Sequence, residues 1–370
     1  MTIKRLLQTI FAVFLPFLLT GCWDNRPIEK RGLVLAVGID PIPAQARKMQ
    51  FTFIESGVVS SRGAPQPIQM ITHTATAISL NRAIVKAEEK MTRDLYLGKL
   101  QDVVISTHLS PAQIQDLMDA LMRDPALDKT YYLAAVAGES AHKVVQFETP
   151  NQVEPMTFLA ARFHCKHCST AQIGEHFWEA FVDVNTAGRA LQIPMVKIHP
   201  NGLKVDTLAI YQGYRFVGSF DRQETVAYLM MRNRVRKAVV EVRTPQGVAD
   251  VIIKSSTVKK KVDWQNGGPV ISIALKLHGL ITQKPAKMNT ISQIRINEIA
   301  ELSEKQIMKL VLKTLAKSAH LRTDVLGFGV VFRHTHPFLA AKYHPWTHYY
   351  NKAMFHLKVT LQIEHMGDLT

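Results

Sequence analysis

The chain has 370 residues, which is more than one hydrophobic core usually supports, so we expect two or three domains. A composition of 47% hydrophobic and 20% charged residues is that of a globular protein and excludes an intrinsically disordered one. The formal charge of +15 suits attraction to anionic headgroups, whereas the scattered basic residues, without aromatic residues between them, argue against a nucleic-acid-binding protein.

The first 21 residues predict an export signal. Lys4 and Arg5 precede an apolar run that ends at Leu19, which is shorter than a bilayer-spanning helix. Leu19-Thr-Gly-Cys22 resembles a bacterial lipobox, in which the cysteine sulfur receives a diacylglycerol and the chain is cut before it. We therefore expect a signal peptide at 1–21 and lipidation at Cys22, with N-acylation of the new amino terminus, because several buried acyl chains make a permanent anchor. The alternative is an ordinary secretory signal that ends near Cys22 by chance.

The N-terminal half, expected at 22–200, alternates strands and helices. Patterns of β-branched and aromatic residues predict strands at 33–39, 49–54, 68–76, 101–106 and 131–137. Ser79 is expected to cap a helix that ends near Met91, and Ser110-Pro-Ala-Gln113 is a capping box that opens another. This order predicts an α/β layer with at least one parallel pairing. Between residues 150 and 200 the pattern is looser.

The C-terminal half, expected at 203–370, is predicted to be mainly antiparallel. Strands are expected at 204–211, 214–219, 235–242, 249–254, 257–262 and 270–278, and a short helix at 224–231. A long amphipathic helix at 296–319 should lie across this sheet, before a final alternating strand at 355–364. The whole is therefore a mixed α+β protein of several subdomains.

His164-Cys-Lys-His-Cys168 is the sharpest local cluster. A disulfide between Cys165 and Cys168 is the simplest state outside the cytoplasm. Two free thiols remain an alternative. A metal site of Cys165, Cys168, His164 and His167 is the least favoured, because structural zinc sites usually need a second ligand pair.

The segment 333–348 is rich in histidine, at His334, His336, His344 and His348. We interpret it as a surface interaction segment with prolines and aromatics, because no carboxylate or cysteine accompanies these histidines as metal ligands would. A metal site or a pH switch is the alternative.

No catalytic motif is evident. The chain has no Gly-x-Ser-x-Gly elbow, no His-Glu-x-x-His helix and no P-loop. Gly327-Phe-Gly329 lacks the third glycine of a dinucleotide fingerprint, and Asn266-Gly-Gly-Pro269 is typical of a turn between strands. We expect a protein that is not an enzyme and binds no cofactor.

Several blocks resemble one known family. They are Leu19-Thr-Gly-Cys22-Trp-Asp24 with Gly32 to Asp40, then Ala209 to Gly218, Asp324-Val-Leu-Gly-Phe-Gly329, Trp346 and the final strand before Gly367. In order and spacing, the chain is similar to the Ger(x)C family, the C-subunit lipoproteins of nutrient germinant receptors in spore-forming bacteria. The histidine-rich cluster at 164–168 and the histidines before Trp346 depart from the family's pattern.

The resemblance implies a mixed α/β protein of about three subdomains, held by lipid on the outer face of the spore inner membrane. It also implies assembly with two multi-pass membrane subunits, of A and B type, into a receptor that triggers germination. No catalytic residue is carried over. A substrate-binding lipoprotein that delivers a small ligand to a transporter is the alternative function, and a surface enzyme acting on the cell wall is a third.

Overall fold

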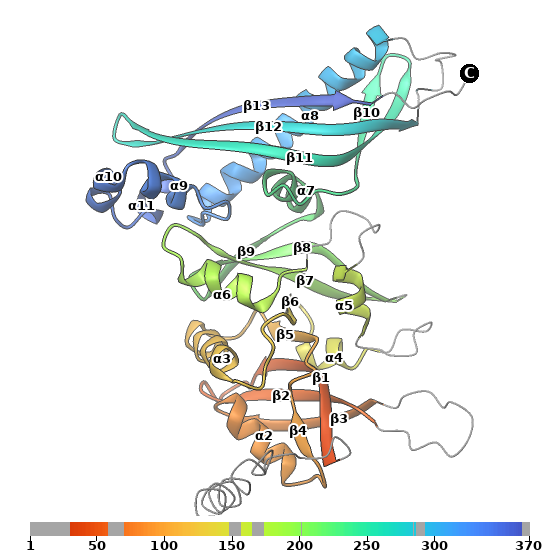
Figure 1. Cartoon of the computed structure of the whole chain (residues 1–370), viewed down its shortest axis with the longest axis vertical. Helices are drawn as coiled ribbons and strands as arrows, with labels where there is room; N and C mark the ends of the chain where they lie inside the picture. Colours follow the sequence, from red (N-terminus) through yellow and green to blue (C-terminus); the bar gives the residue numbers. More distant parts are fainter. Residues whose placement is uncertain are drawn as a thin grey trace, which may run out of the picture.

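The computed structural model describes residues 30–57, 70–147, 157–164, 174–200, 202–283, 285 and 293–364 (Figure 1). Two sheets organise them. The strands of the N-terminal sheet are β1 (Arg31–Pro41), β2 (Met49–Ser56), β3 (Met70–Ala77), β4 (Asp94–Tyr96), β5 (Asp102–Ser106), β6 (Tyr132–Val136), β7 (Leu191–His199), β8 (Gly202–Gln212) and β9 (Arg215–Phe220). Those of the C-terminal sheet are β10 (Ala238–Thr244), β11 (Gly247–Gln265), β12 (Gly268–Gln283) and β13 (Met354–Ile363).

The N-terminal sheet mixes strand directions. Its order is β3-β2-β1-β5-β6-β7-β8-β9, with β4 pairing beside β1. The β1–β5, β5–β6 and β6–β7 pairs are parallel, whereas the outer hairpins are antiparallel. The predicted parallel pairing is therefore confirmed, and the first two strands form an antiparallel hairpin.

Helices cover both faces of this sheet. The helices are α2 (Leu80–Glu88), α3 (Pro111–Arg123), α4 (Ala141–Val145), α5 (Thr157–His164) and α6 (Phe177–Asn185). One apolar cluster joins the sheet to α2, α3 and α6, and a second joins it to α4 and α5. The predicted capping box of α3 is present, because Ser110 Oγ accepts from the backbone N–H of Gln113 at 3.3 Å and the Gln113 amide accepts from that of Ser110 at 2.8 Å. Ser79 occupies the N-cap of α2 without a side-chain capping bond.

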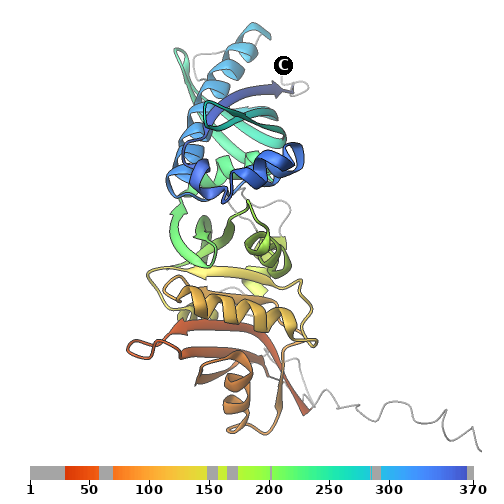
Figure 2. The same cartoon turned by 90° about the vertical axis from the view of Figure 1, so that its left-hand side faces the viewer.

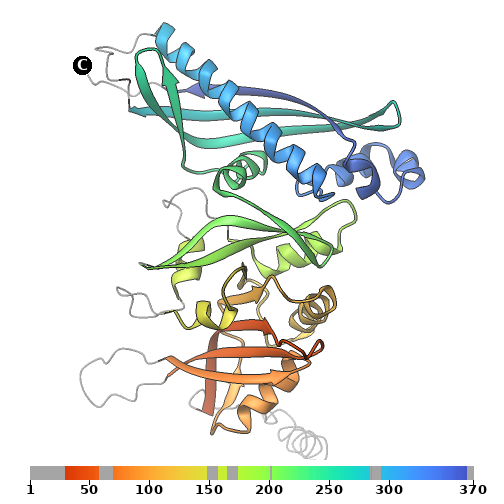
Figure 3. The ribbon, with the colours of Figure 1, turned by 180° about the vertical axis from the view of Figure 1, so that it is seen from behind.

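The C-terminal sheet has one covered and one open face. Its helices are α7 (Arg222–Met231), α8 (Gln293–His320), α9 (Phe328–Thr335), α10 (Pro337–Lys342) and α11 (Thr347–Tyr350). As predicted, the long helix α8 lies across the sheet (Figure 3), where Ile299, Val311 and Leu315 are fully buried. Figures 1 and 2 place this sheet at the end of the elongated molecule opposite β3 and α2.

The strand predictions are wrong in two respects. The strands predicted at 204–211 and 214–219 belong to the N-terminal sheet as β8 and β9, because β7 pairs with β8 from His199 to Leu191. The strands predicted at 249–254 and 257–262 are one strand, β11, in which the register shifts between Ile253 and Ser255. The final strand β13 is parallel to β12, whereas β10–β11 and β11–β12 are antiparallel, so the C-terminal sheet is mainly antiparallel as predicted.

The division expected at residue 200 lies inside the β7–β8 hairpin. The N-terminal sheet therefore continues across this division of the sequence. The domain limits 22–200 and 203–370 stay a prediction. The sequence does not predict strand β7 (Leu191–His199), because Pro194 interrupts its pattern.

Candidate functional site at the joint between the sheets

Two loops meet between the N-terminal sheet and the C-terminal sheet. Each sheet together with its helices is called a layer below, and the contact between them is called the joint. The loop that follows α6 meets the loop that follows α8, where the backbone N–H of Ala190 donates to the carbonyl of Asp324 at 3.1 Å. Arg333 of α9 donates through Nη2 to the carbonyl of Ala187 at 2.6 Å. Gly188 has φ of +81°, and a Cβ there would lie 2.8 Å from the carbonyl carbon of Gly329. Glycine at position 188 therefore allows this loop to lie close to the backbone at Gly329.

Asp324 is the buried polar centre of the joint. Its Oδ2 accepts from the backbone N–H of Gly329 at 2.7 Å and from Nε1 of Trp346 at 2.9 Å. Lys260 of β11 lies nearby and donates to the carbonyl of Leu326 at 2.9 Å. Burial raises the pKa of Asp324 to about 6 against the opposing hydrogen bonds, and burial lowers the pKa of Lys260 to about 8.

A second polar cluster links α6 to the residues that follow α7. Asp183 is 3% exposed and accepts from Arg189 Nη1 at 2.8 Å and from the Gln192 amide at 2.5 Å. Arg232 lies 4.0 Å from the same carboxylate. A carboxylate this deep is tolerated only because cations and hydrogen-bond donors surround it.

Arg234 extends this cluster to two further carboxylates. Its Nη1 lies 3.1 Å from Glu175, which is 2% exposed, and its Nη2 bonds to Glu179. Burial raises the pKa of Glu175 to about 8, while Arg234 opposes that rise. The basic run 232–237, which is one of the densest in the sequence, is thus partly internal and holds the layers together.

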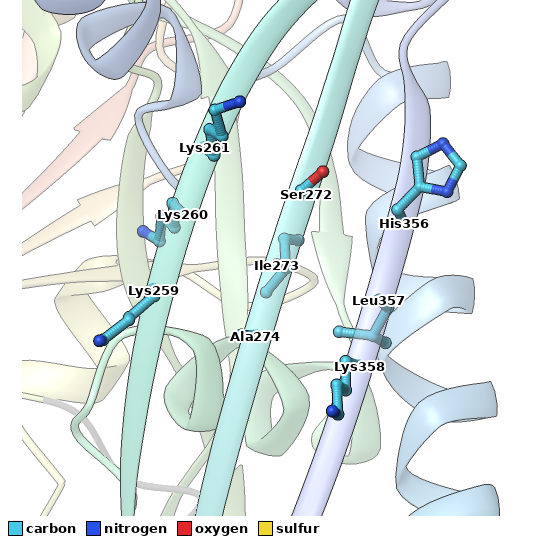
Figure 4. A pocket seen from close by; sticks show the side chains of 9 residues that line it. All are labelled: Lys259, Lys260, Lys261, Ser272, Ile273, Ala274, His356, Leu357 and Lys358. Atoms are coloured by element: carbon cyan, nitrogen blue, oxygen red, sulfur yellow. The ribbon is translucent and has the colours of Figure 1, made fainter.

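The open face of the C-terminal sheet carries the other basic run. Lys259 and Lys261 of β11 and Lys358 and His356 of β13 line a hollow of 430 Å³ on this face. Figure 4 shows these side chains. Lys261 lies 2.8 Å from Asp263, whereas Lys259 and Lys358 form no ion pair within the part of the chain that the structure describes. This face is positively charged, which suits an anionic surface.

The cysteines predicted as sites lie outside the described residues: Cys22, Cys165 and Cys168, as does His167. His164 ends α5, where its Nδ1 lies 2.9 Å from the carbonyl of Ala160 and its ring packs edge-on against Tyr132. Over the described ranges, no group of three or more histidine, cysteine or acidic side chains is arranged to hold a metal ion.

The histidine-rich segment forms α9, α10 and α11. Within it, Trp346 is 8% exposed and Tyr350 is fully buried, so these aromatics belong to the core. His334, His344 and His348 are exposed. None of the helices in the described ranges is long and apolar enough to cross a bilayer.

Two family models match nearly the whole chain. The model described as "Spore germination protein N-terminal domain" matches residues 24–198, and the one described as "Spore germination B3/ GerAC like, C-terminal" matches residues 206–367. The chain belongs to the Ger(x)C family of spore germination proteins.

Curated relatives and a solved structure agree with the Ger(x)C family. Spore germination protein B3 of Bacillus subtilis (strain 168) is 23% identical over 369 residues, which cover 96% of each chain. Spore germination protein KC of the same organism is 19% identical and covers 90% of this chain and 89% of its own. The crystal structure of the GerBC protein matches with a TM-score of 0.59 at 19% identity, covering 90% of this chain and 99% of that one, and it supports the mixed α+β fold.

The family is that of germinant receptor C-subunits, which supports a role of this Ger(x)C protein in spore germination. Three of the blocks that resemble the family lie at the joint or beside it in the fold. Asp324 to Gly329 and Trp346 form the joint, and Ala209 to Gly218 is the β8–β9 hairpin. The ion pairs of Arg234 were not predicted, because their partners lie 59 and 55 residues away in sequence.

Proposed function

We propose that this chain is a lipid-anchored, non-catalytic subunit of a nutrient germinant receptor. In this proposal it works on the exported side of the spore inner membrane, through assembly or signalling with multi-pass membrane subunits of A and B type. The observation that carries the proposal is the match of both family models along nearly the whole chain, behind a segment that resembles a lipobox.

The proposed anchor is diacylglycerol on Cys22, with an acyl group on the new amino terminus. Strand β1 begins at Arg31, nine residues after that cysteine. At about 3.3 Å per residue such a tether reaches no more than about 30 Å, so the body stays close to the headgroups. Several acyl chains, at about 0.8 kcal/mol per buried methylene, hold it there permanently.

The buried acids support a structural role for the charged residues. The carboxylates of Asp183, Glu175 and Asp324 bond to arginines, to backbone N–H groups and to Trp346, and so hold two layers in place. The alternative, a substrate-binding lipoprotein, calls for two similar lobes. Here the sheets differ in strand direction and in helix coverage, which favours the receptor subunit.

We also propose that Cys165 and Cys168 form a local disulfide, because the mature chain would lie outside the cytoplasm. When protein isolated from spores is denatured without reductant and alkylated, neither cysteine should be modified. Labelling of both would refute the disulfide.

The test of function is genetic. In a strain that lacks redundant receptors, deletion of the gene or Cys22→Ala should abolish or blunt germination in response to nutrients. Germination by direct chemical triggers should be unchanged, which controls for spore integrity. A full nutrient response in the deletion strain would refute the proposal. A full response with Cys22→Ala alone would refute only the need for the lipid anchor.

A further inference from the structure

The strand β10 is an open edge of the C-terminal sheet. It pairs with β11 on one side, and no other described strand pairs with it. An edge strand presents unpaired N–H and C=O groups at every second residue, which can template another strand.

Other sheet edges are partly covered by side chains. At β13, the backbone N–H of Leu361 donates to Glu304 of α8 at 2.7 Å. At β3, Lys86 donates to the carbonyl of Thr76 at 2.9 Å. At Ala238 to Arg243 of β10, by contrast, no described residue outside the sheet bonds to the backbone. Of these three edges, β10 is the one whose residues 238–243 receive no such bond from any residue that the structure describes.

An apolar groove runs beside this edge. Between β10, α7 and α8 lies a cavity of 620 Å³, with walls formed by Val226, Met230, Val240, Ile307 and Leu310. A second hollow of 490 Å³ shares Gln223, Glu241 and Gln306 with it and continues to Leu302 and Arg243. Val239 stands at the rim, 60% exposed. The groove is therefore long enough to follow the strand.

Cations outnumber carboxylates in the lining of the cavity. Arg222, Lys309 and Lys313 line it together with one acid, Glu241. Lys313 lies 3.5 Å from Glu224 and 3.9 Å from Asp221, and Glu241 lies 3.8 Å from Arg243, whereas Arg222 and Lys309 form no ion pair with any residue that the structure describes. These two free cations favour a carboxylate on the occupant.

We propose that an extended segment of another protein pairs with β10 as a fifth strand. Its backbone would bond to the open edge, its alternate apolar side chains would enter the groove, and a carboxylate would lie near Arg222 and Lys309. A second copy of this chain is a poorer occupant, because it would bring another cationic rim to the same place. We assign this segment to a membrane subunit of the receptor, and only that assignment rests on the proposed function.

A designed peptide tests this docking mode without any other subunit. The probe is a short peptide of alternating threonine and valine, with an N-terminal lysine for solubility and a free carboxylate, titrated into the full chain in detergent. We expect hydrogen exchange at Ala238–Thr244 to slow while that at Met354–Ile363 is unchanged. Amidation of the carboxylate should weaken binding about tenfold, as should Val239→Asp, which places a second carboxylate at the rim.

Val85→Asp is the matched control, because Val85 on α2 is 58% exposed and remote from the groove. It should bind the probe like the unaltered chain. The proposal is overturned if the probe leaves β10 unprotected, if Val239→Asp and Val85→Asp bind alike, or if β10 of the chain alone becomes protected with rising concentration, which would mean that a second copy occupies it.

The assembled receptor provides the second measurement. In a preparation that contains the membrane subunits, β10 should be protected and β13 should not. Protection by the probe without co-isolation of those subunits would uphold the docking mode and refute the proposed assembly. If β10 is unprotected in the complete receptor, the assembly would be upheld, but pairing of a membrane subunit with β10 would be refuted.

Discussion

Replacement of Trp346 by phenylalanine tests the energetics of the joint. The indole Nε1 donates to the buried Asp324 carboxylate at 2.9 Å, and the side chain is 8% exposed. A hydrogen bond to a charged group contributes about 1.5–3 kcal/mol, and the smaller ring buries less area, at a cost of about 1 kcal/mol. We expect Trp346→Phe to lower the free energy of unfolding by about 2–4 kcal/mol at pH 7.

The loss should depend on pH. The pKa of Asp324 is about 6 in the folded chain, above its unfolded value, so the cost of its charge grows as pH rises through that range. Loss of the Trp346 donor raises this pKa further, by about one unit per 1.36 kcal/mol of lost interaction with the carboxylate. At pH 5 the carboxyl group is largely protonated in both folded proteins. The destabilisation should therefore shrink there to about 1–2 kcal/mol, the part due to packing and a neutral hydrogen bond.

The assay is urea unfolding followed by far-ultraviolet circular dichroism, which does not depend on tryptophan fluorescence. Trp178→Phe is the control, because Trp178 is 45% exposed on α6 and should change the free energy of unfolding by less than about 1 kcal/mol. Equal losses for the two variants, or a loss at Trp346 that is the same at pH 5 and pH 7, would refute this account of the joint.

Two further substitutions probe the same region. Arg234→Ala should destabilise the chain by about 2–4 kcal/mol at pH 7, because it removes two hydrogen bonds, to the buried Glu175 and to Glu179. Arg243→Ala, at a side chain 88% exposed, should have little effect in the same urea titration. Gly188→Ala should lower the thermal midpoint well below that of Gly138→Ala: both glycines have positive φ, of +81° and +82°, but a Cβ at Gly138 meets nothing within 4 Å. Equal losses in either pair would count against the role of the joint.

Local pattern predicted most of the elements. The capping box at Ser110, the alternation of the final strand and the spacing of apolar residues along α8 each appear in the structure as expected. The Asn266-Gly267 turn also has both residues at positive φ, as a two-residue hairpin requires. These features are local, so the sequence around each is sufficient to predict it.

Long-range placement was less predictable. A hairpin pattern does not say which sheet edge the hairpin joins, and β8 and β9 were assigned to the wrong sheet for that reason. The shift in register after Ile253 changes which residues of β11 face the helix, so one strand looked like two.

The candidate site was predicted only in part. The Asp324 block stood out by resemblance, yet its contact with Ala190 joins segments that nothing in either local sequence connects. The sequence around Arg232 and Arg234 does not predict their ion pairs, because the acidic partners of a buried arginine are brought to it by the fold from far along the chain.

The central claim is that the mature protein is fixed to the spore membrane by lipid on one sulfur. Mass spectrometry of the N-terminal peptide, from protein isolated with the spore inner membrane, tests it most directly. The account predicts a chain that begins at Cys22 and carries a diacylglycerol. An unmodified Cys22 thiol with residues 1–21 still attached would contradict it.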